Sequence, residues 1–186
     1  MKRFFDLFLC LIFLFLLAIP MILISIIILF SSKGPVIYWS NRVGKNGVLF
    51  RMPKFRSMLL ETPLIATHLM KDPDAFLFPF GSFLRRFSLD EFPQIFSIIK
   101  GEMSFVGPRP ALFNQEDLIV LRKENGIESL LPGLTGLAQI NGRDNLSIKT
   151  KVALDAEYLT NQSFFLDLKI LLKTFARVFK SDGVSH

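Results

Sequence analysis

A chain of 186 residues is long enough for one domain with a sizeable hydrophobic core. Apolar residues make up 51% of it, and the 21 phenylalanines indicate a surface that faces lipid. A net charge of +6 fits nucleic acid or an anionic membrane, but no zinc-ligand spacing or nucleic-acid motif is present, so no nucleic-acid partner is expected. The single cysteine excludes an intrachain disulfide.

Residues 4–30 form an apolar run in which Asp6 is the only charged side chain. As a helix with a rise of about 1.5 Å per residue, this run is roughly 40 Å long, which exceeds the roughly 30 Å of bilayer hydrocarbon. Pro20 lacks an amide hydrogen and its ring clashes with the carbonyl of Leu16. The sequence therefore predicts a membrane helix with a kink at Pro20.

Two topologies agree with this run. A straight span puts Lys2 and Arg3 on one side of the membrane and the basic stretch 33–56 on the other, which the positive-inside rule permits. A re-entrant hairpin returns both ends to the cytoplasmic face, with Pro20 near the deepest point. The basic residues that flank the run at both ends favour the hairpin.

Residues 36–39 predict a short strand or an interfacial segment, and the Asn46-Gly47 pair predicts a hairpin turn into residues 48–50. Residues 61–80 contain three prolines and little periodicity, so we expect a loop with one short helix.

Asp90 and Glu91 are adjacent carboxylates set among cations, with Arg85 and Arg86 before them and Arg109 after them. In such a setting one carboxylate can act as a nucleophile or base, and its neighbour can hold a divalent cation. Arginine side chains bind phosphate oxygens in a bidentate manner. The pattern suits a phosphorylated substrate.

Ser88 and Glu91 also fit a capping box, in which the two side chains satisfy the first amides of a helix. The two interpretations are compatible, because a helix N-terminus attracts phosphate and favours an ionised carboxylate. The local pattern leaves both open.

Pro108 and Pro110 fix the backbone on either side of Arg109, which holds a cation in place at little entropic cost. Farther along, residues 130–143 contain enough glycine for the backbone to approach a ligand closely. The polar candidates for contact with a nucleotide or sugar there are Gln139, Asn141 and Arg143.

Two helices are expected in the carboxyl-terminal third. Residues 114–124 predict a helix with Asn114 as its N-cap. Residues 164–180 predict a basic amphipathic helix that either packs on the core or lies at the membrane interface. Its apolar face comprises Phe164, Leu168, Leu171, Leu172, Phe175 and Phe179, and its basic face comprises Lys169, Lys173, Arg177 and Lys180.

Six segments in order resemble the bacterial sugar transferase family of small monotopic phosphoglycosyl transferases, and they extend over nearly the whole chain. They are Lys2-Arg3 with Asp6, Gly34-Pro35-Val36, Lys54-Phe55-Arg56-Ser57-Met58, the stretch from Asp90-Glu91 to Gly107-Pro108-Arg109-Pro110, the stretch from Pro132-Gly133 to Asn141-Gly142-Arg143, and Asp167-Leu168-Lys169-Ile170.

The resemblance implies transfer of a sugar 1-phosphate from a UDP-sugar to undecaprenyl (polyprenyl) phosphate, with release of UMP. Asp90 is then the nucleophile of a ping-pong mechanism through an aspartyl-phosphosugar intermediate, and Glu91 holds Mg²⁺. The implied substrate-binding residues are Lys54, Arg56, Arg85, Arg109, Gln139, Asn141 and Arg143. For Lys54 and Arg56, anchoring to anionic lipid is the alternative.

The expected fold is α+β, mainly helical with a few short β-strands, with a Pro-kinked re-entrant membrane helix and amphipathic interfacial helices. Residues 1–32 are the membrane hairpin and residues 33–186 the catalytic domain. The family implies the bacterial inner membrane, with this domain on the cytoplasmic face and in contact with membrane lipid. The sequence leaves the oligomeric state open, a homo-oligomer included.

Two other functions fit parts of the pattern. A non-catalytic membrane-anchored protein that binds lipid or a partner explains the charge and the apolar ends, but not a carboxylate pair ringed by arginines. A soluble enzyme that hydrolyses nucleotide sugars explains the pair but not the apolar run.

Overall fold

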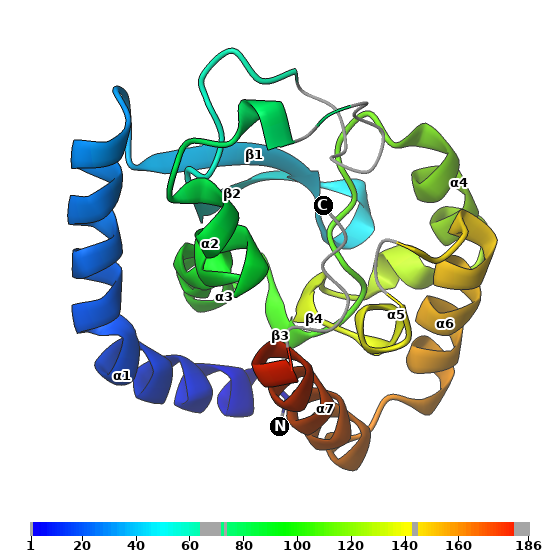
Figure 1. Ribbon diagram of the computed structural model, residues 1–186. Helices are drawn as coiled ribbons and strands as arrows, with labels where there is room; N and C mark the ends of the chain where they lie inside the picture. The colour runs from blue at the N-terminus through cyan, green and yellow to red at the C-terminus, as the bar shows by residue number, and fades with distance from the viewer. Residues whose placement is uncertain (1, 64–71, 73, 143–144, 181–186) are drawn as a thin grey trace.

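The computed structural model describes residues 2–63, 72, 74–142 and 145–180 (Figure 1). The α-helices are α1 (Lys2–Ser31), α2 (Gly81–Arg86), α3 (Ile95–Lys100), α4 (Glu116–Glu124), α5 (Leu137–Ile140), α6 (Ile148–Asn161) and α7 (Phe164–Lys180). The 3-10 helices are η1 (Lys45–Gly47), η3 (Asp74–Phe76), η4 (Leu89–Gln94) and η5 (Ile127–Ser129). The strands are β1 (Ile37–Val43), β2 (Leu49–Phe55), β3 (Ser104–Val106) and β4 (Gly133–Thr135). The prediction of a mainly helical fold with a few short strands is confirmed.

The predicted hairpin is the antiparallel pair of β1 and β2, which runs in register from Ile37 opposite Phe55 to Val43 opposite Leu49. Asn46 and Gly47 turn the chain with positive φ angles of 55° and 77°, as their residue types favour. Both strands are longer than predicted: β1 continues to Val43 and β2 continues to Phe55. Their length carries Lys54 toward η4, which packs against β2.

The parallel pair of β3 and β4 lies at the centre of the molecule (Figure 1). Ser104 is opposite Gly133, and Val106 is opposite Thr135. A Cβ atom on Gly133 would lie 2.1 Å from the amide nitrogen of Gly107, so glycine is required where the two backbones meet. β3 leads directly into the segment that carries Arg109, and this close pairing determines where that segment begins.

α1 is an uninterrupted helix that contains Pro20, and Figure 1 shows its two halves running in different directions around one side of the molecule. Before Pro20, Cys10 is buried in a cluster with residues of β3 and α3. After Pro20, Ile24 and Ile28 are buried in a second cluster with Phe55, Phe78 and Leu84. The helix thus packs on the domain along both halves.

Most of the α1 surface is apolar and exposed, with Phe15 exposed to 85% and Phe30 to 89%. By length and composition, α1 is long and apolar enough to cross a membrane. Only 11% of its most apolar stretch is buried within the protein. Such an exposed apolar surface on a long helix indicates membrane association.

Polar contacts attach both ends of α1 to the domain. Lys2 forms an ion pair with Asp167 of α7, and the guanidinium of Arg3 donates to the carbonyls of Ile98 and Ile99 at the end of α3. At the other end, the guanidinium of Arg56 donates to the carbonyls of Ser32 and Lys33, the two residues that directly follow α1. These contacts hold both ends of the apolar helix against one domain.

α7 has the predicted boundaries. Asp167 and Ile170 are exposed to only 4% and 0%, and Leu171, on the predicted apolar face, is partly buried and packs against the core. A second apolar stripe remains exposed and includes Phe165, Leu168, Leu172 and Phe175. The helix therefore packs on the core through one face, as one of the two alternatives predicts, and keeps another apolar face exposed. Contact of that exposed face with the membrane stays a prediction.

The predicted N-cap of α4 is wrong. The helix begins at Glu116, with Gln115 rather than Asn114 at the N-cap position. The side-chain oxygen of Gln115 accepts a hydrogen bond from the Leu112 amide at 2.8 Å, so the chain forms a turn before the helix begins.

Candidate active site

Asp90 and Glu91 lie in the first turn of η4, and each residue is only 8% exposed. Ser88 adopts a left-handed conformation with φ of 54°, and its side chain makes no capping hydrogen bond. Instead, its carbonyl accepts from the Glu91 amide at 3.2 Å, which closes a 3-10 turn. The capping-box interpretation is therefore wrong. The Glu91 carboxylate faces Lys54 and Arg109 instead.

Glu91 binds two cations through a single oxygen. Its Oε1 lies 2.9 Å from Nζ of Lys54 and 3.0 Å from Nη2 of Arg109. Lys54 also lies 3.7 Å from Oδ2 of Asp90, so this one ammonium group faces both carboxylates. The structure thus brings together Lys54 from β2, the Asp90-Glu91 pair from η4, and Arg109 from the segment after β3.

Apolar packing holds η4 in place. Leu89 and Phe92, on either side of the carboxylate pair, pack against the cluster that contains Ile24 and Ile28 of α1. The apolar cluster that holds the carboxylate turn therefore includes residues of α1. Pro93 is tolerated because the turn is short and α3 starts only at Ile95.

Two further predicted site residues, Arg85 and Arg56, contact other parts of the chain. Nη1 of Arg85, in α2, lies 3.4 Å from the sulfur of Met58. Arg56 donates to the carbonyls of Lys33 and Ser32 at 2.5 and 2.9 Å, so both terminal nitrogens hold the end of α1. A substrate-binding role for Arg85 and Arg56 stays a prediction.

The glycine-rich segment contributes Gln139 and Asn141. Both polar atoms of the Gln139 amide are buried, and within the described residues neither has a hydrogen-bond partner. Asn141 is exposed and donates to the Leu137 carbonyl at 2.8 Å, at the end of α5. Arg143 lies outside the described residues.

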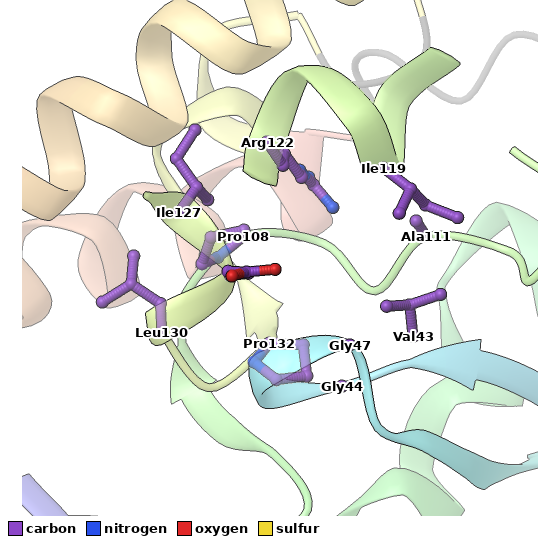
Figure 2. A pocket seen from close by; sticks show the side chains of 11 residues that line it. Val43, Gly44, Gly47, Pro108, Ala111, Ile119, Arg122, Ile127, Leu130 and Pro132 are labelled. Atoms are coloured by element: carbon purple, nitrogen blue, oxygen red, sulfur yellow. The ribbon is translucent and has the colours of Figure 1, made fainter. Parts of the chain in front are cut away.

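A pocket lies beside the segment that carries Arg109, and Figure 2 shows the residues that surround it. Its lining comes from β1 and the following turn, from α4 and η5, and from Pro108 and Ala111. The carboxylate pair does not line this pocket. Its one lining arginine, Arg122, was not among the predicted site residues.

Comparison with known proteins identifies the family. Residues 1–181 match the bacterial sugar transferase family. The chain belongs to that family. It is 38% identical over 199 residues to the exopolysaccharide production protein ExoY of Rhizobium meliloti, an alignment that covers 98% of this chain and 87% of the relative. It is 39% identical over 169 residues to the sugar transferase EpsL of Bacillus subtilis, covering 87% and 82% of the two chains. It is also 34% identical over 201 residues to the undecaprenyl-phosphate galactose phosphotransferase of Salmonella typhimurium, covering 98% of this chain and 41% of that protein.

The family resemblance predicted from six sequence segments is confirmed, and so is the enzyme class, a phosphoglycosyl transferase. The non-catalytic alternative assigned no role to the carboxylate pair, and family membership gives the chain a catalytic identity.

The carboxylate pair offers oxygen ligands of the kind that Mg²⁺ prefers. Among the described residues, no group of three or more His, Cys, Asp or Glu side chains is arranged to hold a metal. Mg²⁺ is commonly held by one or two carboxylates together with waters and substrate phosphates, and Asp90 and Glu91 supply two such carboxylates. Binding of Mg²⁺ by Glu91 stays a prediction.

Arg42, Arg122 and Asp155 were not among the predicted site residues, although Arg42 and Arg122 donate to the backbone beside Arg109 and Asp155 binds Arg122. Arg122 is in the last turn of α4, where a basic residue is already explained by the helix dipole. Its contacts join residues far apart in the chain, and no local pattern signals them.

Proposed function

We propose that this sugar transferase moves a sugar 1-phosphate from a UDP-sugar to undecaprenyl phosphate and releases UMP. The observation that carries the proposal is the nearly buried Asp90-Glu91 pair in contact with Lys54 and Arg109, on a turn that packs in one apolar cluster with α1. The Salmonella relative, named for galactose and undecaprenyl phosphate, supports this pair of substrate classes.

In the first step, a carboxylate oxygen of Asp90 attacks the sugar-bearing phosphorus of the UDP-sugar. A new oxygen–phosphorus bond forms, and the bond from that phosphorus to the bridging oxygen breaks. UMP leaves with the bridging oxygen and its electron pair. The product on the enzyme is an aspartyl phosphosugar.

In the second step, a phosphate oxygen of undecaprenyl phosphate attacks the same phosphorus. The bond to Asp90 breaks, the carboxylate is regenerated, and the lipid diphosphate sugar is released. Two steps suit two substrates of opposite solubility, because the nucleotide and the lipid need not occupy the site together. Ping-pong kinetics follow.

The cations around the pair stabilise the negative charge that builds up on the phosphoryl oxygens. Lys54 faces both carboxylates and is suited to hold the attacked phosphoryl group, and Arg109 presents its guanidinium beside Glu91. Glu91 would hold Mg²⁺, which, when bound, neutralises diphosphate charge and polarises the phosphoryl oxygens.

The roles of the outer residues rest on the family motifs that contain them. Arg85 and Arg56 are proposed to supply further positive charge, and Arg143 is proposed to bind the nucleotide together with Gln139 and Asn141. The unpartnered amide of Gln139 supports a role in binding, since a buried amide without partners is costly unless a ligand group satisfies it.

We also propose that α1 is re-entrant, so that residues 33–186 lie on the cytoplasmic face of the bacterial inner membrane. The attachment of both α1 ends to one domain supports this topology, because a straight span would separate them by the bilayer. The exposed apolar stripe of α7 then meets membrane lipid beside α1.

The test is UMP release in a single mixing experiment with a panel of UDP-sugars and no lipid acceptor. With the correct sugar, the covalent scheme predicts release of about one UMP per enzyme, followed by turnover when undecaprenyl phosphate is added. The Asp90→Asn variant should release none.

Each other function gives a different result. A hydrolase releases UMP continuously without the lipid, and a direct transfer between two bound substrates releases none until the lipid is present. A non-catalytic protein releases none under either condition. Any of these results contradicts the proposal.

A further inference from the structure

The backbone around Arg109 is held at four successive carbonyl groups. The Pro108 carbonyl accepts from the Gly133 amide at 2.8 Å, and the Ala111 carbonyl accepts from the Val43 amide at 3.0 Å. Between them, the Arg109 carbonyl accepts from a side chain of α4, and the Pro110 carbonyl accepts from a side chain of β1. Donors from β4, α4 and β1 thus converge on one short segment.

Arg122 is the donor to the Arg109 carbonyl, through Nη1 at 2.8 Å. Its Nε and Nη2 bind Oδ2 of Asp155 at 3.0 and 2.7 Å. Asp155, in α6, is only 1% exposed. Figure 2 shows Arg122 on the side of the pocket where the chain passes between Pro108 and Ala111.

Asp155 fixes the orientation of Arg122. Burial raises the pKa of the Asp155 carboxyl above its ordinary value, while the guanidinium of Arg122 lowers it. A buried carboxylate is costly unless it is paired, so the ion pair holds the guanidinium in one orientation. In that orientation the remaining nitrogen reaches the Arg109 carbonyl.

Arg42 supports the next carbonyl. Its Nη1 donates to the Pro110 carbonyl at 3.1 Å, and its Nε donates to the Ser40 hydroxyl at 2.9 Å. Proline has no amide hydrogen, so the backbone of Pro108 and Pro110 can be held only through its carbonyls. The Pro108 carbonyl accepts from a backbone amide, and the Pro110 carbonyl accepts from the side chain of Arg42.

We infer that Arg122, oriented by Asp155, and Arg42 are positioning residues that hold the main chain of Arg109 so that its guanidinium meets Glu91. The inference rests on the proposed role of Arg109 in binding the transferred phosphoryl group. Neither Arg122 nor Arg42 is assigned a contact with substrate, and both act through Arg109.

The test is a set of double-mutant cycles on the rate of UMP release. Arg122→Met removes the donor but leaves Asp155 unpaired, so it is combined with Asp155→Leu, because an apolar pair commonly replaces a buried ion pair without loss of stability. We expect the Arg122→Met/Asp155→Leu variant to unfold near the wild-type temperature and to release UMP about 10- to 100-fold more slowly. In an Arg109→Ala background, the same pair of changes should slow release less than about threefold, because the residue it positions is absent.

Lys123→Met is the matched control, since Lys123 is the exposed neighbour of Arg122 on α4, and its rate should equal that of the wild type. Arg42→Met, which removes the donor to the Pro110 carbonyl, is tested in the same cycle and keeps the inference testable if the double variant fails to fold.

An equal loss of rate in the wild-type and Arg109→Ala backgrounds would mean that Arg122 and Arg42 only stabilise the fold, and the inference would be wrong. Wild-type rates in the folded double variant would also overturn it. A wild-type rate for Arg109→Ala alone would instead refute the proposed role of Arg109, so the two failures are distinguishable.

Discussion

At the scale of single residues, Lys54 is the cation that faces both carboxylates of the site. Its ammonium group is 2.9 Å from Glu91 and 3.7 Å from Asp90, and its side chain is only 14% exposed. A lysine in this position offers positive charge to a bound phosphoryl group.

Removing that charge should slow the reaction far more than it weakens the fold. For Lys54→Met, which keeps the length of the side chain, we expect UMP release to fall about 100- to 1000-fold. The rate is measured with saturating UDP-sugar, and Lys45→Met on the exposed hairpin turn is the control. A Lys54→Met rate within about threefold of the control would exclude Lys54 from the reaction.

The residues of the site differ in how well the sequence predicts them. Asp90, Glu91 and Arg109 belong to one motif-bearing stretch, so their proximity was predictable. Arg122 and Asp155 were not, because their contact joins α4 and α6 and neither residue departs from the pattern of an ordinary helix. For Glu91 the sequence also allowed an interpretation that is wrong. Its spacing from Ser88 fits a capping box, but Ser88 adopts a left-handed conformation and makes no capping hydrogen bond.

At the scale of elements, Asp6 links the membrane helix to the strand that leads to Arg109. Its Oδ1 accepts from the Ser104 hydroxyl at 3.0 Å and from the Phe105 amide at 3.1 Å, and the residue is 2% exposed. α1 therefore contacts the active-site framework through a buried carboxylate as well as through apolar packing.

Asp6→Ala should destabilise the protein by about 1–3 kcal/mol, because two buried donors lose their acceptor. Thermal unfolding in detergent measures the loss, and Asp6→Asn, which keeps an acceptor oxygen, should recover part of it. The control is Ser25→Ala, whose hydroxyl bonds only the Met21 carbonyl of its own helix. Equal stability of the Asp6→Ala and Ser25→Ala variants would show that Asp6 does not hold α1 to β3.

α6 and α7 are joined by Tyr158, whose hydroxyl donates to Asp167 at 2.6 Å. Burial, together with the hydrogen bond to Asp167, raises the pKa of Tyr158 well above its ordinary value. In the unfolded chain the phenol loses its proton near pH 10, whereas the folded chain retains it. The folded state then binds more protons, so stability present below about pH 10 is lost as the pH rises above that value.

The effect is measured as the change in unfolding temperature between pH 9 and pH 11. Tyr158→Phe should lower stability at pH 8 through loss of the hydrogen bond, but should reduce the further loss at pH 11. Tyr38→Phe, at an exposed tyrosine, should leave the alkaline loss unchanged. An alkaline loss that is the same in wild type and Tyr158→Phe would contradict the assignment.

Prediction of the elements succeeded where a pattern is long or contains a turn signal. The boundaries of α7 and the hairpin at Asn46-Gly47 are of this kind. The pairing of β3 with β4 was not predicted, because each strand has three residues and their contact depends on glycines that bring distant backbones together. The sequence left the core packing of α7 open, because the helix carries apolar residues on more than one face.

At the scale of the whole molecule, the apolar surfaces of α1 and α7 meet at one end. The rings of Phe5 and Phe164 lie 5.0 Å apart in an edge-to-face arrangement, and Lys2 binds Asp167 beside them. The start of the membrane helix is thus attached to the domain, in agreement with a re-entrant topology.

A protease-cleavable tag at the amino terminus tests that topology. In inverted inner-membrane vesicles, which expose the cytoplasmic face, a re-entrant α1 predicts that the protease removes the tag. A carboxyl-terminal tag is the control for exposure of the domain. An amino-terminal tag that stays protected until detergent is added would establish a straight span instead.

The central claim is that Asp90 becomes bonded to phosphorus during the reaction. Trypsin releases it in the peptide of residues 87–100, where Asp90 and Glu91 are the only acidic side chains. After incubation with the UDP-sugar alone and quenching in mild acid, we predict that this peptide gains the mass of one sugar phosphate, and that fragmentation places the added mass on Asp90. An unmodified peptide from enzyme that has released UMP, or the added mass on another residue, would contradict the account.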